Sequence, residues 1–119
     1  MSAEIKNEKG LITISNSVIA KLAGSAATQC YGVVGMCAKN SKDGIAGILK
    51  RENIDKGIRV KTEGNVVEIA LYIVVEYGLN IGIIGETIRS SVKYSVEKAT
   101  GLEVSKVQVF VESVRIDHA

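Results

Sequence analysis

The stretch VVEIALYIVVEY at residues 66–77 constrains the fold more than any other part of the chain. It contains no glycine or proline and is rich in β-branched and aromatic residues, which is typical of a long β-strand. Because side chains alternate between the two faces of a strand, the odd-numbered residues from Val67 to Tyr77 form one apolar face. The even-numbered face mixes charged with apolar side chains: Val66, Glu68, Ala70, Tyr72, Val74 and Glu76. We expect the first face to lie in the core, and the second is too apolar to be covered by water alone.

A tight β-hairpin is predicted immediately before this strand. Gly64 and Asn65 join it to the segment IRVKTE, and glycine in the first central position suits a two-residue hairpin turn. Such a turn fixes the following register: Glu63 with Val66, Lys61 with Glu68, Val60 with Ile69, and Ile58 with Leu71. The Lys61–Glu68 pair then carries opposite charges on the outer face, where cross-strand pairs of opposite charge are favourable.

The remaining segments alternate between strands and helices. GLITIS at residues 10–15 is a predicted strand, and Ser15 or Asn16 caps a helix that runs to about residue 30. YGVVGMCA at 31–38 is the next strand. After the hairpin, Asn80 caps a second helix over about 81–100, Gly101 ends it, and LEVSKVQVFVESVRI at 102–116 is the last strand.

The order strand, helix, strand, hairpin, helix, strand predicts an α+β fold. We expect a two-layer sandwich in which both long helices lie on one face of a mostly antiparallel sheet. A chain of 119 residues is the size of a single domain, which we place at residues 10–116. Residues 1–9 are polar and of mixed charge, so they are expected to form a flexible N-terminal tail, and residues 117–119 a C-terminal one.

The alternation of apolar residues changes phase within the last strand. Val107, Val109 and Val111 share one face, whereas Val114 has the opposite parity. A β-bulge near Glu112 and Ser113 would produce this change, because one extra residue reverses the side-chain alternation. Before the bulge, Phe110 then points to the same outer face as Tyr72 and Val74.

The chain carries few groups suited to catalysis or metal binding. Its one histidine, His118, lies close to the C-terminus, and the spacing of Cys30 and Cys37 matches no common zinc motif. Neither a P-loop nor a dinucleotide fingerprint occurs. We therefore expect no catalytic residues, no metal and no cofactor, with both cysteines reduced and serving as small hydrophobic residues.

Cellular location is also constrained by the composition. The N-terminus, MSAEIKNEKG, lacks the apolar segment of a signal peptide, and no stretch approaches the roughly 20 apolar residues of a membrane span. These features indicate a cytoplasmic protein without direct membrane insertion. The net charge of +2 is too small to imply that the whole molecule binds a polyanion.

One alternative function comes from the basic segment at residues 39–61. Its GIAG stretch fits the four-residue loop with which KH domains clamp a nucleic-acid backbone, although Ile45 and Ala46 occupy positions that favour basic residues. The alternative is a small RNA-binding module with the following contacts: Lys42, Gly44, Gly47, Lys50 and Arg51.

The outer face of the sheet is the main candidate for a binding surface. Apolar patches ringed by polar residues commonly mark protein interfaces. We expect the partner to contact these residues: Tyr72, Val74, Phe110, Lys61 and Glu68. The other possibility is that segment 39–56 folds back and covers this face.

Taken together, several stretches resemble the alkaline shock protein family of Gram-positive bacteria. They are GLITIS, YGVVGM, NVVEIALYIVVEYG and TGLEVSKVQVFVESV, in this order, and the resemblance covers about residues 9–116. It is the joint order that is specific, since each stretch alone is only a strand pattern.

The resemblance implies a cytosolic, non-enzymatic protein linked to the envelope or alkaline stress response. Such proteins act through protein–protein contacts or self-association as homo-oligomers, and some are recruited to the inner face of the membrane by a membrane-anchored partner. The family offers no catalytic residues to carry over. This chain lacks the extended charged tails of longer members and is more similar to the short-tailed ones.

Overall fold

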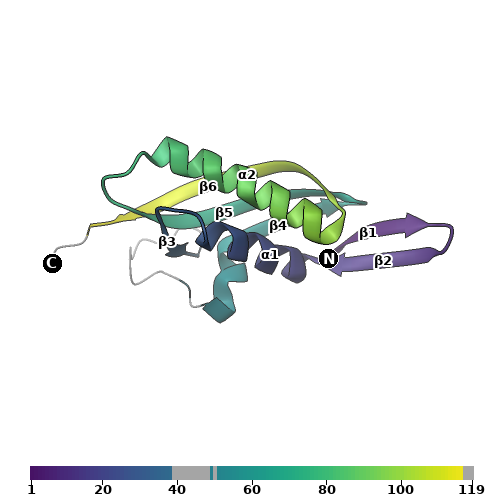
Figure 1. Ribbon diagram of the computed structural model, residues 1–119. Helices are drawn as coiled ribbons and strands as arrows, with labels where there is room; N and C mark the ends of the chain where they lie inside the picture. Colours follow the sequence, from purple (N-terminus) through teal and green to yellow (C-terminus); the bar gives the residue numbers. More distant parts are fainter. Residues whose placement is uncertain (39–48, 50, 117–119) are drawn as a thin grey trace.

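The computed structural model describes residues 1–38, 49 and 51–116, and it has the predicted α+β architecture (Figure 1). Its elements in chain order are β1 (Ser2–Asn7), β2 (Gly10–Ser15), α1 (Asn16–Thr28), β3 (Val33–Met36), the 3-10 helix η2 (Arg51–Gly57), β4 (Ile58–Glu63), β5 (Val66–Glu76), α2 (Ile81–Thr100) and β6 (Glu103–Arg115). The two α-helices lie on the same face of a four-stranded sheet, so the two-layer prediction is confirmed.

β5 is the central strand of that sheet. β6 runs parallel to it from Val66 to Glu76 and therefore occupies one whole edge. The other edge is shared, since β4 pairs antiparallel with residues 66–71 and β3 with residues 73–75. Most of β5 thus has strand neighbours on both sides.

The predicted hairpin register is confirmed. Lys61 is the partner of Glu68 and Ile58 the partner of Leu71, and the whole β4–β5 ladder follows without a shift. Gly64 begins the turn with a φ of +61°, in the left-handed region that favours glycine. Local turn chemistry therefore sets which residues of β5 face the helices.

The main core lies between the helices and the odd-numbered face of β5. The fully buried odd-numbered residues of β5 are Val67, Ile69, Leu71, Ile73 and Val75, and α2 contributes Ile84, Ile88, Val92 and Val96. α1 contributes mostly alanines. A side chain added at Gly24 would meet the ends of Ile54 and Ile58 at 3.0 Å, which confirms the close approach that glycine in this helix predicts.

The helices begin and end where the sequence predicts. The Ser15 hydroxyl accepts a hydrogen bond from the Val18 N–H at 3.3 Å, and the Asn80 side chain accepts one from the Ile83 N–H at 3.1 Å. Gly101 ends α2 with a φ of +77°. These are ordinary capping arrangements, and each satisfies backbone groups that the helix leaves unpaired.

β6 contains two register shifts against β5. One leaves Glu112 as an extra residue, so the bulge predicted near Glu112 and Ser113 is confirmed. The other leaves Ser105 as an extra residue and was not predicted. Because each bulge reverses the alternation, Val104, Val107 and Val114 can all pack against the main core despite their different parity.

The N-terminal residues are not the flexible tail that the sequence suggested. Ser2–Asn7 form β1, which pairs antiparallel with β2, and Ala3 is completely buried. The Glu4 N–H donates to the Gly64 carbonyl at 2.9 Å and ties this strand to the turn of the other hairpin. Although residues 1–9 are mostly polar, Ala3 and Ile5 alternate on one face of β1. They pair with Ile14 and Ile12 of β2. The folded domain thus includes Ser2–Asn7, which the sequence places in the tail.

Gly85 within α2 and Gly101 at its end are expected to respond to alanine in opposite directions. Gly101→Ala is expected to lower the free energy of unfolding by about 1 kcal/mol, since alanine is strained at positive φ. Gly85→Ala should raise it by up to about 1 kcal/mol, because alanine favours the helix and its Cβ would meet nothing within 4 Å. Urea unfolding of both variants measures the two effects, and changes of the same sign would contradict the structure.

Candidate functional site

A stacked aromatic pair lies on the outer face of the sheet. Tyr72 of β5 and Phe110 of β6 are neighbours in the ladder, and their ring centroids are 5.0 Å apart with an interplanar angle of 13°. Tyr72 is only 6% exposed, whereas Phe110 is 41% exposed. The pair therefore presents the Phe110 ring to solvent above a buried tyrosine.

Tyr72 and Val74 belong to a second small core cluster, separate from the main one. Its other members are Cys37, which is buried, and Val34, which is partly buried. The Cys37 N–H donates to the Tyr72 carbonyl at 3.0 Å and holds the end of β3 against β5. The prediction that these side chains point away from the helices is confirmed, but the expectation that they form an exposed patch is wrong for Tyr72 and Val74. Their burial within this cluster leaves Phe110 as the exposed part.

An open depression of about 380 Å³ lies on the outer face beside this aromatic pair. Its lining includes Arg59 and Lys61 from β4, Glu68, Ala70 and Tyr72 from β5, and Gln108 and Phe110 from β6. The structure thus brings together four of the five residues named from the sequence and leaves out Val74. Arg59 and Ala70 were missed, and the signal for Ala70 was its small size between two larger side chains of the same strand face.

Charged residues bound this surface at both ends. Near the β4–β5 turn, Lys61 and Glu68 are exposed cross-strand partners. At the opposite end of β5, the Arg115 guanidinium is ion-paired with the Glu76 carboxylate, and both side chains are about one third exposed. The exposed part of Phe110 therefore lies between two charged ends, a pattern typical of a protein-binding surface with a polar rim.

The segment proposed to cover the outer face is described only in part. Leu49 and Ile54 pack against the main core, and both line a depression beside α1 rather than the outer face. Of the residues proposed to contact nucleic acid, Lys42, Gly44, Gly47 and Lys50 lie outside the described residues. Arg51 begins η2. The nucleic-acid interpretation stays a prediction.

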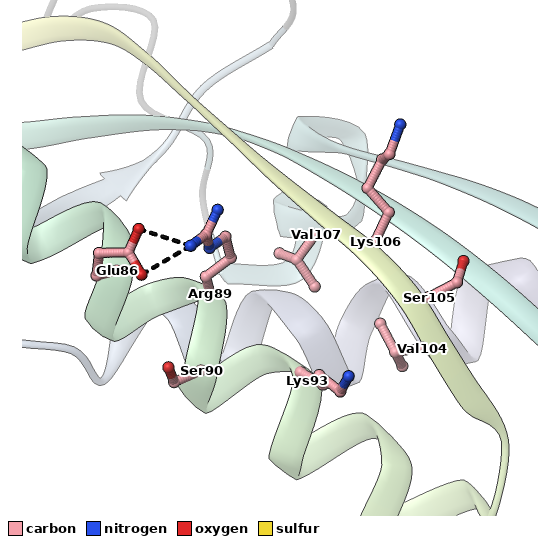
Figure 2. Close-up of a pocket in the computed structure, with 8 residues that line it drawn as sticks. All are labelled: Glu86, Arg89, Ser90, Lys93, Val104, Ser105, Lys106 and Val107. Carbon is pink, nitrogen blue, oxygen red and sulfur yellow. Dashed lines mark hydrogen bonds and ion pairs between the residues drawn. The ribbon is translucent and has the colours of Figure 1, made fainter.

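A third depression lies between α2 and β6 (Figure 2). It is lined by Glu86, Arg89, Ser90 and Lys93 from the helix and by Val104, Ser105, Lys106 and Val107 from the strand. Arg89 Nη2 donates to both carboxylate oxygens of Glu86, at 2.6 and 2.7 Å. The one carboxylate in this groove is therefore already engaged, and the other polar side chains lining it are a serine and a lysine on each wall.

Cys37 is not suited to nucleophilic chemistry. Burial raises the pKa of the Cys37 thiol, and the nearby Glu112 carboxylate raises it further. The thiolate is the reactive form of cysteine, so both the burial and the raised pKa of Cys37 disfavour reaction there. Cys30 donates through its Sγ to the Ala26 carbonyl at 3.4 Å. Among residues 1–38, 49 and 51–116, no three groups cluster in a way that could hold a metal ion.

With this geometry established, comparison with known proteins identifies the family. The family model for alkaline shock protein 23, described as having a cell envelope-related function, matches residues 4–116. The chain belongs to this family, as the resemblance noted in the sequence suggested. The matched region includes most of β1, in agreement with the corrected N-terminus.

Individual relatives support the same assignment. The chain is 44% identical to the uncharacterized protein YloU of Bacillus subtilis over 98% of both chains. It is 29% identical to a stress response regulator gls24 homolog of Streptococcus pyogenes, covering 90% of this chain and 60% of the relative. A solved MamM CTD structure shares the fold with a TM-score of 0.52 at 14% identity, covering 83% of this chain and 99% of that one. At such low identity, this last similarity concerns the fold alone.

The environment of Cys37 predicts a change in alkaline stability. Above about pH 8.5 the unfolded chain ionises this thiol, while the folded chain keeps it protonated. The free energy of unfolding should therefore fall as the pH rises from the ordinary thiol pKa toward the raised one. Cys37→Ala removes this contribution, so its stability should decline less steeply than that of the wild type.

The measurement is the urea midpoint of each protein at a series of alkaline pH values. Cys30→Ala is the matched control, since it also removes one thiol from the chain. An alkaline decline that is equally steep with and without Cys37 would show that this thiol does not couple folding to pH.

Proposed function

We propose that this protein is a non-enzymatic interaction module of the envelope or alkaline stress response, and that it binds a protein partner through the depression on its outer sheet face. The observation that carries the proposal is the Phe110 ring, 41% exposed on a buried tyrosine. Binding energy in protein interfaces is concentrated in a few anchored residues, often aromatic ones. A ring stacked on Tyr72 needs little further ordering when a partner binds.

The charges around the depression indicate the chemistry of the partner. Arg59 and Lys61 come from β4, and Glu68 faces them from the adjacent strand. A partner that covers Phe110 with an apolar side chain and presents an acidic group toward β4 would complement this arrangement. Such charges mainly set orientation and specificity, while the apolar contact supplies affinity.

The proposed role includes recruitment by a membrane-anchored partner. No helix within the described residues has both the length and the apolar character to cross a membrane. Family membership gives an envelope-related function, so contact with an anchored protein would connect this chain to the envelope. The proposal places the chain in the cytoplasm, at the inner face of the membrane when it is bound.

The groups available for chemistry favour binding over catalysis. Cys37 is buried with a raised pKa, and the Glu86 carboxylate is bound by Arg89. Neither residue lies in the outer depression, where the titratable side chains are two cations, one carboxylate and a buried tyrosine. This set recognises a partner by charge and aromatic contact.

The variant Phe110→Lys tests the outer face directly. It replaces an exposed apolar ring with a charge, so folding should be unchanged while the partner is lost. For an anchor residue, the affinity should fall by roughly 30-fold or more, equivalent to about 2 kcal/mol. The measurement is affinity capture of the tagged protein from cells, with mass spectrometry of what co-purifies.

Tyr77→Lys is the matched control, because Tyr77 is an exposed aromatic residue beyond the end of β5. We expect it to retain the partners of the wild type. If Phe110→Lys captures the same proteins in the same amounts, the outer face is not the docking site.

A further inference from the structure

The hairpin formed by β1 and β2 has an unprotected edge. β2 pairs with β1 on one side, and none of the other described strands pairs with it. Figure 1 shows the hairpin extending from one end of the domain, away from the four-stranded sheet. Its outer edge is therefore open to another molecule.

The composition of β2 makes this edge unusual. The strand is GLITIS, with no charged residue, and Leu11 and Ile12 are 53% and 57% exposed. Proteins normally protect open edges with charges, prolines or bulges, because an unpaired edge is a template for another strand. The long edge strand β6 follows that rule, with Glu103, Lys106, Glu112 and Arg115 along it. β3 is also uncharged, but it has only four residues and a register shift.

Only part of the apolar face of this hairpin is stabilised by contact with the main core. Ala3 and Ile5 anchor its apolar face to the main core, and the Cβ of an alanine at Gly101 would lie 3.9 Å from the Ile5 side chain. On the same face Ile12, the partner of Ile5, remains more than half exposed. An isolated two-stranded hairpin is at best marginally stable in water, and a further strand would stabilise it.

We propose that β2 pairs antiparallel with β2 of a second copy of this chain, to form a continuous four-stranded arm in the order β1-β2-β2-β1. The surface is separate from the outer-face depression and goes beyond the docking function proposed for it. Because the contact is isologous, it closes as a dimer.

Symmetry and charge both favour a second copy over a different protein. Antiparallel pairing of two identical strands requires a two-fold axis perpendicular to the sheet, and this axis keeps the same face of both copies on the same side. The apolar rows Ile5–Ile12 of the two copies then continue across the arm. Self-pairing of a charged strand would bring like charges close together across the axis, and β2 carries none.

The two-fold axis also restricts the register. Residues that face each other must point to the same side, so residue numbers that pair must both be odd or both be even. For this short strand, the central pairings are Ile12 with its own copy or Thr13 with its own copy. The first pairs Ile12 with Ile12 and the second pairs Ile12 with Ile14, so Ile12 packs against an isoleucine in either register.

Analytical ultracentrifugation over a concentration series tests the proposal on the intact protein. The wild type should show a reversible monomer–dimer equilibrium. Ile12→Lys places two like charges near the axis and should weaken dimerisation at least tenfold. Ile83→Lys is the matched control, since Ile83 is 64% exposed on α2 and away from β2, and it should dimerise like the wild type.

Cysteine cross-linking tests the geometry without relying on a destabilising charge. Under mild oxidation, Ile12→Cys or Thr13→Cys should form a disulfide-linked dimer, depending on which residue lies on the axis, because facing Cα atoms on paired strands lie within disulfide range. Ile83→Cys and the wild type, which keeps both native cysteines, should remain largely uncross-linked.

A wild type that stays monomeric at every concentration would overturn the proposal. So would a dimer in which neither Ile12→Cys nor Thr13→Cys cross-links more than Ile83→Cys. Neither outcome affects docking at Phe110. Loss of docking in Phe110→Lys would likewise leave dimerisation through β2 unchanged. The two proposals are therefore tested independently.

Discussion

The central position of β5, with helices over one face and strands along its edges, is the constraint on which the rest of the structure depends. Its odd-numbered face packs against both helices, and its edges are occupied by β6 on one side and by β4 and β3 on the other. The even-numbered face is then the part of β5 that the helices do not cover. Near β3 it is sealed by the cluster around Tyr72 and Val74, and nearer the turn it opens into the depression. The candidate site is therefore a consequence of where β3 ends its pairing with β5.

The two surfaces proposed for binding differ in their physical basis. At the outer face, a single aromatic ring is exposed among charges, an arrangement that favours a specific partner with complementary groups. Along β2, the backbone of an uncharged strand is open, an arrangement that favours pairing with another strand and, because β2 carries no charge, with a second copy of itself. The depression lies on the main sheet and β2 in the projecting hairpin, so a dimer joined through β2 leaves both depressions available. Such a molecule would present two equivalent docking faces to an anchored partner, and two linked sites bind more strongly than one.

The features predicted correctly from the sequence are those set by a few neighbouring residues. The Gly64-Asn65 turn fixed the β4–β5 register, Asn80 and Gly101 fixed the ends of α2, and the parity change between Val111 and Val114 revealed the bulge at Glu112. β1 was not predicted because only two apolar residues, Ala3 and Ile5, alternate within its polar sequence. The bulge at Ser105 was not predicted because it lies close to the start of β6. Too few residues of the strand precede it to show which side chains alternate onto which face.

For the candidate site, the sequence determined which side chains of β5 point away from the helices, since alternation along a strand is a local property. It could not determine which of them stay exposed. Tyr72 stacks on Phe110, and both Tyr72 and Val74 pack with Cys37, so these contacts join segments that are remote in the chain. Exposure depends on what the neighbouring strands bring alongside, and only the tertiary structure decides that.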